Sequence, residues 1–409
     1  MTCSPPRQGA QLSWNSALTL RCVSCSQVVS PGPEYSGCGG CGAPLVTSYS
    51  APSLPAGDPV SAVEALRTHH LPISVDQLVN LGQQATPLVA AGDGALLKLE
   101  AQNPTGSHKD RFHAVAAAIA LGLGHHSVVT ASTGNHGLAC SAFSAAAGLG
   151  SLVLLHPEAP ASVATQIASH GAHLAVLPGA IRETVIALVD DGWCPATSAD
   201  PALAGRANPY GSDGYRAIAY EIVQQVGHVP AIVAVPAASG DTFYGVWRGF
   251  RDMHEILDLP MPRLLACQPA GAAPLALTES LSASEPQEVA DPVSAALSAR
   301  DPRSGWHATV ALRSDGQPIM VPEELLVHTL ASLAHRGHSF EPAAALAVAG
   351  LNVARSTGAC DPDVEAVAIV TSSGANWTEH LQPVFGPPVV HRDGEDLAQA
   401  LAERSGSAA

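Results

Sequence analysis

The chain of 409 residues is poor in charge, in aromatic side chains and above all in positive charge. Charged residues make up 13% of it and aromatic residues 4%, so we expect many helices to pack on both sides. There are 19 Lys and Arg against 35 Asp and Glu, a formal net charge of −16 that would repel a nucleic-acid backbone or an anionic membrane. These shortages favour a small-molecule partner.

Long apolar runs are also missing. The longest, Ala114 to Leu123, is far shorter than the ~20 residues that span a bilayer. Met1 to Gln8 carries no signal-peptide pattern, so we expect a soluble, cytoplasmic protein. At ~100 to 200 residues per domain the length predicts two or three folding units, which the hydrophobic share of 46% can fill.

Four of the nine cysteines form two C-x-x-C pairs, Cys22 with Cys25 and Cys38 with Cys41. Two such pairs can turn four thiolates toward one point, which is typical of a structural zinc site. A pair of disulfides or a redox C-x-x-C is the alternative. Four cysteine ligands would leave no open position on a zinc ion, so we expect no catalysis there. The predicted zinc-ribbon-like module covers residues 18–48.

After this module, short apolar runs alternate with helix-length, alanine-rich stretches. The candidate strands are 96–100, 127–131, 151–155, 173–177, 231–235, 263–267 and 367–370, and candidate helices include 111–121, 137–147 and 214–225. This alternation predicts an α/β protein with parallel sheets covered by helices. Residues 281–306, with their Pro, Ser and Asp content, are predicted to be irregular.

Four polar or glycine-bearing segments follow candidate strands, where α/β sheets collect their ligands: 103–111, 132–137, 236–245 and 371–374. The first places Lys109 at a turn-to-helix junction. A helix N-terminus and burial both disfavour a charged amine there, which leaves a nucleophile. The alternative, a surface lysine, is weakened because Lys98 is the only other lysine in the chain.

The other three segments carry weaker signals. Ser132 to Gly137 offers hydroxyls and glycines that suit either a carboxylate cradle or an ordinary N-cap. Pro236 to Thr242 could hold a phosphate with successive backbone N–H groups and two hydroxyls. The hydroxyls of 371–374 stand at the end of a candidate strand but do not by themselves indicate a function.

Taken together, these segments resemble the threonine synthase family of pyridoxal-phosphate enzymes, which have the tryptophan-synthase-β-like fold (fold type II). The resemblance rests on Asn-Pro-Thr-Gly-Ser-x-Lys-Asp-Arg at 103–111, Ser-Thr-Gly-Asn at 132–135, Asn-Pro-Tyr at 208–210, Ser-Gly-Asp-Thr at 239–242 and Glu-Pro at 341–342. It implies two doubly wound parallel-sheet domains behind the zinc ribbon. The larger, cofactor-binding one would comprise 58–110 and 190–395, and the smaller, mobile one 111–189. A homodimer is expected.

The resemblance also implies roles for single residues. Lys109 would bind the pyridoxal phosphate covalently and move protons on the substrate, and Thr371 would meet the pyridine nitrogen. Asn135 would bond the cofactor's phenolic oxygen, and His136 would lie near the substrate. The cofactor phosphate would be held by Ala238, Ser239, Gly240, Asp241 and Thr242, the substrate carboxylate by Ser132 and Thr133, and a substrate phosphate by Arg111.

Three departures from the family pattern concern the substrate. This chain has His108 in place of Phe, Phe112 in place of Gly and His136 in place of Thr. The run Gly-Asn-His-Gly at 134–137 is more similar to serine and threonine dehydratases. Both histidines would be either acid–base groups near neutral pH or space-filling side chains with satisfied nitrogens.

The leading hypothesis is a threonine synthase-like lyase that converts O-phosphohomoserine and water into threonine and phosphate. The alternatives on the same scaffold are β-elimination or β-replacement on another amino acid, including a serine or threonine dehydratase. A hypothesis of another class is a catalytically silent, ribbon-bearing binding protein. Lys109 argues against it, because a sensor needs no imine-forming amine.

Overall fold

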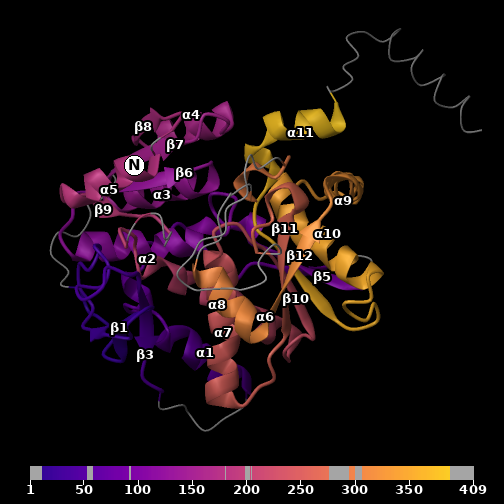
Figure 1. The fold of residues 1–409 in the computed structure, drawn as a ribbon, viewed down its shortest axis with the longest axis horizontal. Helices are drawn as coiled ribbons and strands as arrows, with labels where there is room; N and C mark the ends of the chain where they lie inside the picture. The colour runs from indigo at the N-terminus through magenta and orange to yellow at the C-terminus, as the bar shows by residue number, and fades with distance from the viewer. Residues whose placement is uncertain are drawn as a thin grey trace, which may run out of the picture.

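The computed structural model describes residues 12–52, 59–91, 94–179, 181–198, 203, 205–275, 294–299 and 306–386. Within these ranges the chain forms three sheets, a small N-terminal one and two larger ones covered by helices (Figure 1). No helix in the described ranges is long and apolar enough to cross a membrane. Parts of the predicted irregular segment 281–306 and of the predicted larger domain lie outside the described residues.

The N-terminal sheet is antiparallel, in the order β2-β1-β3. Its strands are β1 (Leu18–Cys22), β2 (Val28–Val29) and β3 (Leu45–Tyr49). Leu18 and Leu20 are buried while Arg21 is exposed, so one face of the sheet packs inward. This face shares a hydrophobic core with the helices and strands of the smaller parallel sheet. The ribbon is therefore built into the body of the protein rather than attached to it by a tether.

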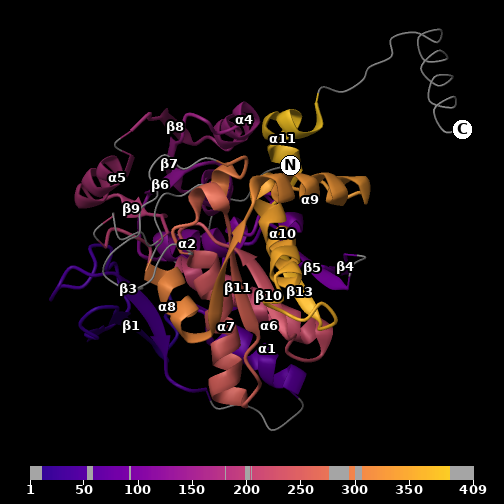
Figure 2. The same cartoon turned by 45° about the vertical axis from the view of Figure 1, so that its right-hand side comes forward.

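The largest sheet has six strands, parallel except for the antiparallel edge strand β4. In spatial order they are β12 (Gly316–Val321), β11 (Arg263–Pro269), β10 (Ile232–Pro236), β13 (Ala366–Val370), β5 (Ala95–Leu99) and β4 (Leu88–Ala90). On one face lie α9 (Glu323–His335) and α10 (Pro342–Ser356), with α11 (Thr378–Phe385) beyond them. The other face packs on α1 (Pro59–His69), α6 (Arg216–Val226), α7 (Asp241–Leu257) and α8 (Trp306–Asp315). Figure 2 shows α10 running alongside the strands.

The smaller parallel sheet has four strands. In spatial order they are β8 (His173–Val176), β7 (Gly150–Leu155), β6 (Ser127–Ser132) and β9 (Cys194–Pro195). The helices packed on it are α2 (Lys109–Gly122), α3 (Asn135–Ala147), α4 (Ala161–Ser169) and α5 (Ile181–Asp190). Strand β9 belongs to this sheet, so the sheet extends beyond the predicted boundary at residue 189; the division into domains otherwise stays a prediction.

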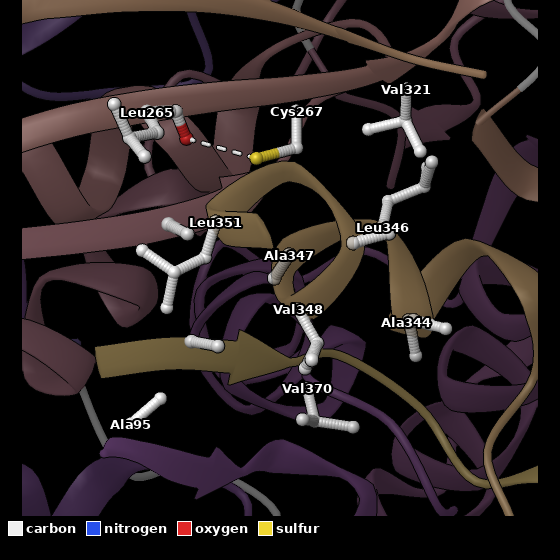
Figure 3. Close-up of a cluster of buried hydrophobic side chains, with 14 of the residues drawn as sticks. Ala95, Leu265, Cys267, Val321, Ala344, Leu346, Ala347, Val348, Leu351 and Val370 are labelled. Atoms are coloured by element: carbon white, nitrogen blue, oxygen red, sulfur yellow. Dashed lines mark hydrogen bonds between the residues drawn. The ribbon is translucent and has the colours of Figure 1, made fainter. Parts of the chain in front are cut away.

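The scarcity of charge is explained by helices that are buried almost all round. Figure 3 shows α10 packed between strands, with Leu346, Ala347 and Val348 among Cys267 and Val370. Small alanine side chains let such a helix lie close to the sheet, because every face of it meets protein rather than water. The expectation of helices packed on both sides is confirmed for α10 and for α2 and α3.

The predicted strands and helices match the structure closely. All seven candidate strands form, with ends within a few residues of those expected, and the three candidate helices form as α2, α3 and α6. The predicted α/β class with parallel sheets is therefore confirmed. The short strands β4 and β9 and the strand β12 were not anticipated.

Candidate active site

One cavity lies where the carboxyl ends of the two parallel sheets face each other. The space there that no atom fills, with the open mouth of the cavity included, is about 560 Å³. It is lined by His108, Lys109, Thr133, Asn135, His136, Pro236, Ala238, Ser239, Gly240, Asp241, Thr242, Ser298, Ala299, Ala343 and Thr371. Segments from all four predicted loops meet here.

Lys109 is the first residue of α2 and extends into this cavity. Burial lowers its pKa from the usual value for lysine, and the nearby carboxylates of Asp241 and Glu341 only partly oppose that shift. Its Nζ lies 5.5 Å from the centre of the Tyr215 ring. A buried amine that loses its proton easily is a nucleophile, so the site chemistry expected for Lys109 fits its surroundings.

The loop before Lys109 is fixed to the end of β13. The backbone N–H of His108 donates to the carbonyl oxygen of Thr371 at 2.9 Å, and the N–H of Ser373 donates to the carbonyl of Gly106 at 2.9 Å. Inside the loop, the backbone N–H of Thr105 donates to the Asp110 carboxylate at 2.8 Å. Lys109 therefore starts from a rigid backbone, as a reacting group must.

The second sheet contributes Asn135, whose amide is fixed on both sides. Its Nδ2 donates to Oε2 of Glu341 at 2.6 Å, and its Oδ1 accepts from the indole N–H of Trp377 at 3.0 Å. Burial raises the pKa of Glu341, while hydrogen bonds from Ser298 and Asn135 oppose the rise. One Nδ2 hydrogen of Asn135 is left to face the cavity, so this residue can donate to a ligand oxygen.

The loop after β10 forms the start of α7. Gly240 has φ +102°, a left-handed conformation that lets the chain turn into the helix. The backbone N–H groups that follow it open the helix and point out of its N-terminus, and the hydroxyls of Ser239 and Thr242 also line the cavity. This is a cradle for a phosphate group. The residues present therefore fit pyridoxal phosphate: an amine, a phosphate cradle and, across the cavity, Thr371.

The two cavity histidines are neutral and held in place. Burial and then the charge of Lys109 lower the pKa of His136 to about 3 and that of His108 well below its usual value. His136 Nε2 contacts the carbonyl of Ala196 at 2.8 Å and must donate, so its Nδ1 accepts from Nε2 of His113 at 3.3 Å. With both nitrogens engaged, His136 is a space-filling residue with satisfied hydrogen bonds rather than an acid–base group.

Of the predicted substrate-binding residues, Ser132 and Arg111 do not line the cavity. The hydroxyl oxygen of Ser132 accepts from the backbone N–H groups of Gly134 and Gly137, at 2.9 and 2.7 Å, and so shapes the loop from beneath. Thr133, beside it, does line the cavity. Of the two residues predicted to bind the substrate carboxylate, Ser132 therefore has its hydroxyl inside the loop, whereas Thr133 lies at the cavity.

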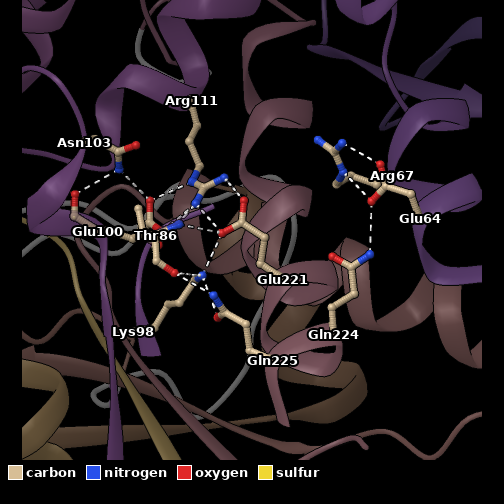
Figure 4. Close-up of polar contacts among 10 residues, drawn as sticks. All are labelled: Glu64, Arg67, Thr86, Lys98, Glu100, Asn103, Arg111, Glu221, Gln224 and Gln225. Atoms are coloured by element: carbon tan, nitrogen blue, oxygen red, sulfur yellow. Dashed lines mark hydrogen bonds and ion pairs between the residues drawn. The ribbon is translucent and has the colours of Figure 1, made fainter. Parts of the chain in front are cut away.

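Arg111 points away from the cavity, which corrects the expectation that it binds a substrate phosphate. Its Nε donates to Glu100 Oε2 at 2.6 Å, and its Nη1 donates to Glu221 Oε1 at 2.6 Å (Figure 4). Figure 4 also shows Lys98 in this network, paired with Glu221. Both carboxylates already accept from the guanidinium, so its donors are engaged away from the cavity.

Several site residues escaped the sequence analysis or were noted only as parts of a motif. Glu341, known only as a motif residue, holds Asn135. His113 supports His136, and Tyr215 packs near Lys109. Ser298 lines the cavity from a segment predicted to be irregular. Apart from the Glu-Pro motif at Glu341, no local signal marks them, because their contacts at the site are with residues distant in sequence.

The four predicted metal-ligating cysteines lie together in the ribbon. Sγ of Cys22 lies 3.4 Å from Sγ of Cys41, and Sγ of Cys25 lies 3.6 Å from Sγ of Cys38. All four sulfurs are within 4.8 Å of one another. These separations exceed the about 2.05 Å of a disulfide and bracket the about 3.8 Å expected between thiolates around a tetrahedral zinc ion. The cluster can therefore hold one metal ion.

Backbone N–H groups point at one of these sulfurs, as they do in metal knuckles. The N–H groups of Ser24 and Cys25 each donate to Sγ of Cys22 at 3.4 Å. Burial alone would raise the pKa of Cys22, but these donors and the neighbouring thiols bring it below the usual value for cysteine. Cys22 thus favours the thiolate form that binds a metal, whereas the neighbouring thiols raise the pKa of Cys25.

Comparison with known proteins agrees with this geometry. The family model described as pyridoxal-phosphate dependent enzyme matches residues 79–372. The threonine synthase of Mycobacterium tuberculosis is 31% identical over 80% of this chain and 91% of its own length. That of Halalkalibacterium halodurans is 29% identical over 74% of this chain and 86% of its own.

Solved structures share the fold at lower identity. A fungal L-serine ammonia-lyase from Rhizomucor miehei superposes with a TM-score of 0.63 at 20% identity, covering 74% of this chain and 97% of that one. Maize serine racemase does so with a TM-score of 0.61 at 20% identity, covering 74% and 93%. The chain belongs to the family of pyridoxal-phosphate-dependent enzymes and is threonine synthase-like within it.

Proposed function

We propose that the protein is a lyase that uses pyridoxal phosphate to break a carbon–oxygen bond in the side chain of a small amino acid. The observation that carries this proposal is the buried Lys109 amine, which shares one cavity with the phosphate cradle of α7. Pyridoxal phosphate, when bound, withdraws electrons from the α-carbon of the substrate and makes its C–H bond acidic.

The residues of the chain supply positions for the remaining work. The Lys109 amine takes a proton from the substrate and returns it at a neighbouring carbon, since burial keeps its pKa low enough for both steps. Asn135 and Thr371 line the cavity, where Asn135 would donate to the cofactor's phenolic oxygen and Thr371 would offer a hydroxyl to its ring nitrogen. Thr133 binds the substrate carboxylate. The neutral His136 fills the space beside it and keeps water out.

The first candidate reaction is the synthesis of threonine from O-phosphohomoserine. A proton leaves Cβ and the bond between Cγ and the phosphate oxygen breaks, which forms a carbon–carbon double bond and releases phosphate. A water molecule then adds its hydroxyl at Cβ and a proton at Cγ. Relatives named threonine synthase, 29 to 31% identical over most of this chain, support it. The Asn-Pro-Thr-Gly-Ser-x-Lys-Asp-Arg motif of the family also supports it.

A second candidate, elimination of water from serine or threonine, is favoured by the charges of the cavity. Among the described lining residues, Lys109 carries the sole side-chain cation, while Asp241 supplies a carboxylate. Arg111 is held by Glu100 and Glu221. A substrate phosphate needs a cation beside it, whereas a hydroxyl leaving group does not.

Product analysis separates the two candidates. The purified, cofactor-loaded protein is incubated with O-phosphohomoserine, with serine and with threonine, and phosphate, threonine, ammonia and keto acid are measured. Phosphate and threonine from the first substrate support threonine synthesis. Ammonia and a keto acid from serine or threonine support the dehydratase. Turnover of none of the three would refute the proposed lyase activity on these amino acids.

We also propose that the ion held by the four cysteines is zinc with a structural role. Four sulfur ligands at tetrahedral spacing suit zinc and leave no open position for a substrate. Metal analysis of protein purified without chelator is expected to find one zinc per chain. A homodimer in the cytoplasm stays a prediction, and size-exclusion chromatography with light scattering tests its oligomeric state.

A further inference from the structure

The ribbon forms hydrogen bonds with a segment that also contacts the active-site lysine. This relay segment, residues 205–216, includes η4 (Gly211–Tyr215) and runs into α6. Near its start, the hydroxyl of Tyr210 donates to the carbonyl of Gly32 at 2.6 Å and accepts from the N–H of Gly32 at 2.8 Å. Tyr210 is fully buried and Gly32 is half-buried, so this two-way contact is partly shielded from water. It fixes the relay segment to the loop between the two cysteine pairs.

A second contact joins the relay segment to the end of β3. The Asp213 carboxylate accepts from the hydroxyl of Thr47 at 2.7 Å and from the hydroxyl of Tyr49 at 2.6 Å. Arg216 donates to the same carboxylate at 2.8 Å and to Asp252 at 2.6 Å. Hydrogen bonds to a buried, ionised carboxylate are stronger than those between neutral groups. The ribbon therefore satisfies a charge that the relay segment would otherwise bury with fewer partners.

The relay segment in turn lies on the first turn of α2. At Gly214 an added Cβ would be 2.0 Å from the carbonyl oxygen of Arg111, so no side chain fits between the two backbones. The next residue, Tyr215, is fully buried with its ring 5.6 Å from that of His108 and 5.5 Å from Nζ of Lys109. A tyrosine ring at this distance blocks one side of the space that the lysine side chain can occupy.

We propose that Tyr215 is a positioning residue for Lys109, and that the metal-loaded ribbon holds Tyr215 in place through Tyr210 and Asp213. This inference rests on the proposed role of Lys109 in binding the cofactor. A small ribbon depends on its metal for stability, so loss of the ion frees β3 and the loop around Gly32. The relay segment then loses both anchors, and the cofactor binds more weakly. Because coupling is reciprocal, a bound cofactor also tightens the metal.

The experiment compares cofactor affinity with and without the metal. The holoenzyme is treated with a chelator, metal content is measured, and the cofactor dissociation constant and the circular dichroism of the cofactor band are recorded. Coupling between sites commonly changes affinity by about 5- to 150-fold, so metal removal is expected to raise the dissociation constant at least about fivefold. The cofactor dichroism should weaken at the same time, because the cofactor is held less rigidly.

The double variant Thr47→Val/Tyr49→Phe removes the two hydroxyls that reach Asp213 and leaves the thiolates and the cavity untouched. With zinc bound, it should bind the cofactor more weakly than the unmodified protein. Chelation should then change its affinity by a smaller factor than in the unmodified protein, because only the anchor at Tyr210 is left to lose. Tyr49→Phe alone is the milder version, because the ring stays over Arg216. Thr19→Val is the matched control, since the Thr19 hydroxyl contacts only Ser48 of the ribbon. It should behave like the unmodified protein.

A ring substitution tests Tyr215 directly. Tyr215→Leu should alter the cofactor dichroism and the pH midpoint of its bond to Lys109, and Tyr215→Phe should restore both. Complete metal loss with unchanged cofactor affinity and dichroism would overturn the inference while leaving the proposed function intact. A fully metal-loaded protein that binds no cofactor at Lys109 would instead overturn the proposed function, and the inference with it.

Discussion

The ammonium group of Lys98 lies 2.6 Å from Oε2 of Glu221, in a place where Lys98 has no exposure to solvent. It also donates to the carbonyl of Thr86 at 2.7 Å and to the amide oxygen of Gln225 at 3.0 Å. These three acceptors use all three hydrogens of the ammonium. One of the two lysines of the chain is therefore committed to structure, which leaves Lys109 for the cofactor.

The first prediction follows from this division. Lys109→Ala should lose the absorption of covalently bound cofactor, because Lys98 cannot reach the cavity. Borohydride reduction of the unmodified protein and peptide mapping should place the cofactor on the peptide that contains Lys109. A modified Lys98, or no modified peptide at all, would show that the assignment is wrong.

A second prediction concerns Arg111. Arg111→Met should destabilise the protein by about 3–5 kcal/mol, because removal of the guanidinium leaves the buried Glu100 without its ion-pair partner and Glu221 with Lys98 alone. The urea midpoint measures this loss. Arg206→Met is the control: its pair with Asp190 is largely exposed and should be worth no more than about 1 kcal/mol. If Arg111→Met instead raises KM and leaves the urea midpoint unchanged, Arg111 binds the substrate.

The third prediction is a pH dependence caused by His136. Burial lowers its pKa to about 3 in the folded protein, whereas in an unfolded chain the pKa is about 6.5. Below pH 6.5 the unfolded chain takes up a proton that the folded protein does not, so folding becomes less favourable as the pH falls.

The measurement compares urea midpoints of the unmodified protein and of His136→Gln from pH 8 to pH 5. The difference between them should be constant above about pH 6.5 and should shift in favour of the variant below it, by up to about 1.4 kcal/mol per pH unit. A difference that stays constant down to pH 5 would mean that His136 takes up its proton over the same pH range in the folded and the unfolded protein, so its pKa is not lowered by folding.

The fourth prediction concerns the ribbon metal. Cys22→Ser should release the ion and lower the thermal midpoint, because three remaining thiolates bind a metal far less tightly than four. Cys360→Ser is the control. Cys360 is a free cysteine outside the cluster, so this variant should retain the metal. Equal metal content in the two variants would contradict the four-cysteine site.

The fold could be predicted because its signals are local. The apolar runs that form β6 and β10 are short, flanked by turns and rich in β-branched residues. The spacing of the two C-x-x-C pairs alone predicts the ribbon. The loop before Lys109 could also be recognised, because its residues are consecutive. Strand β9 was missed because two residues carry no periodicity.

The roles of charged residues could not be predicted in the same way. Arg111 and Glu221 are 110 residues apart, and nothing in either segment shows that their side chains meet. The position of Arg111 beside the cofactor lysine suggested a ligand, whereas helical geometry turns neighbouring side chains in different directions. For His136, the sequence left two uses open, and only the contacts with Ala196 and His113 decide between them.

The union of the ribbon with the relay segment has a consequence for the synthesis of the protein. Thr47 leaves the ribosome long before its partner Asp213, which is 166 residues further along the chain. At about 5–20 residues per second, this delay lasts on the order of ten to thirty seconds. During that time Thr47 and Tyr49 lack their carboxylate partner, so the ribbon has only its metal and the earlier part of its core to hold it, and its thiols are open to oxidation if no metal is bound. Early capture of a metal ion would protect the thiols until the rest of the chain arrives.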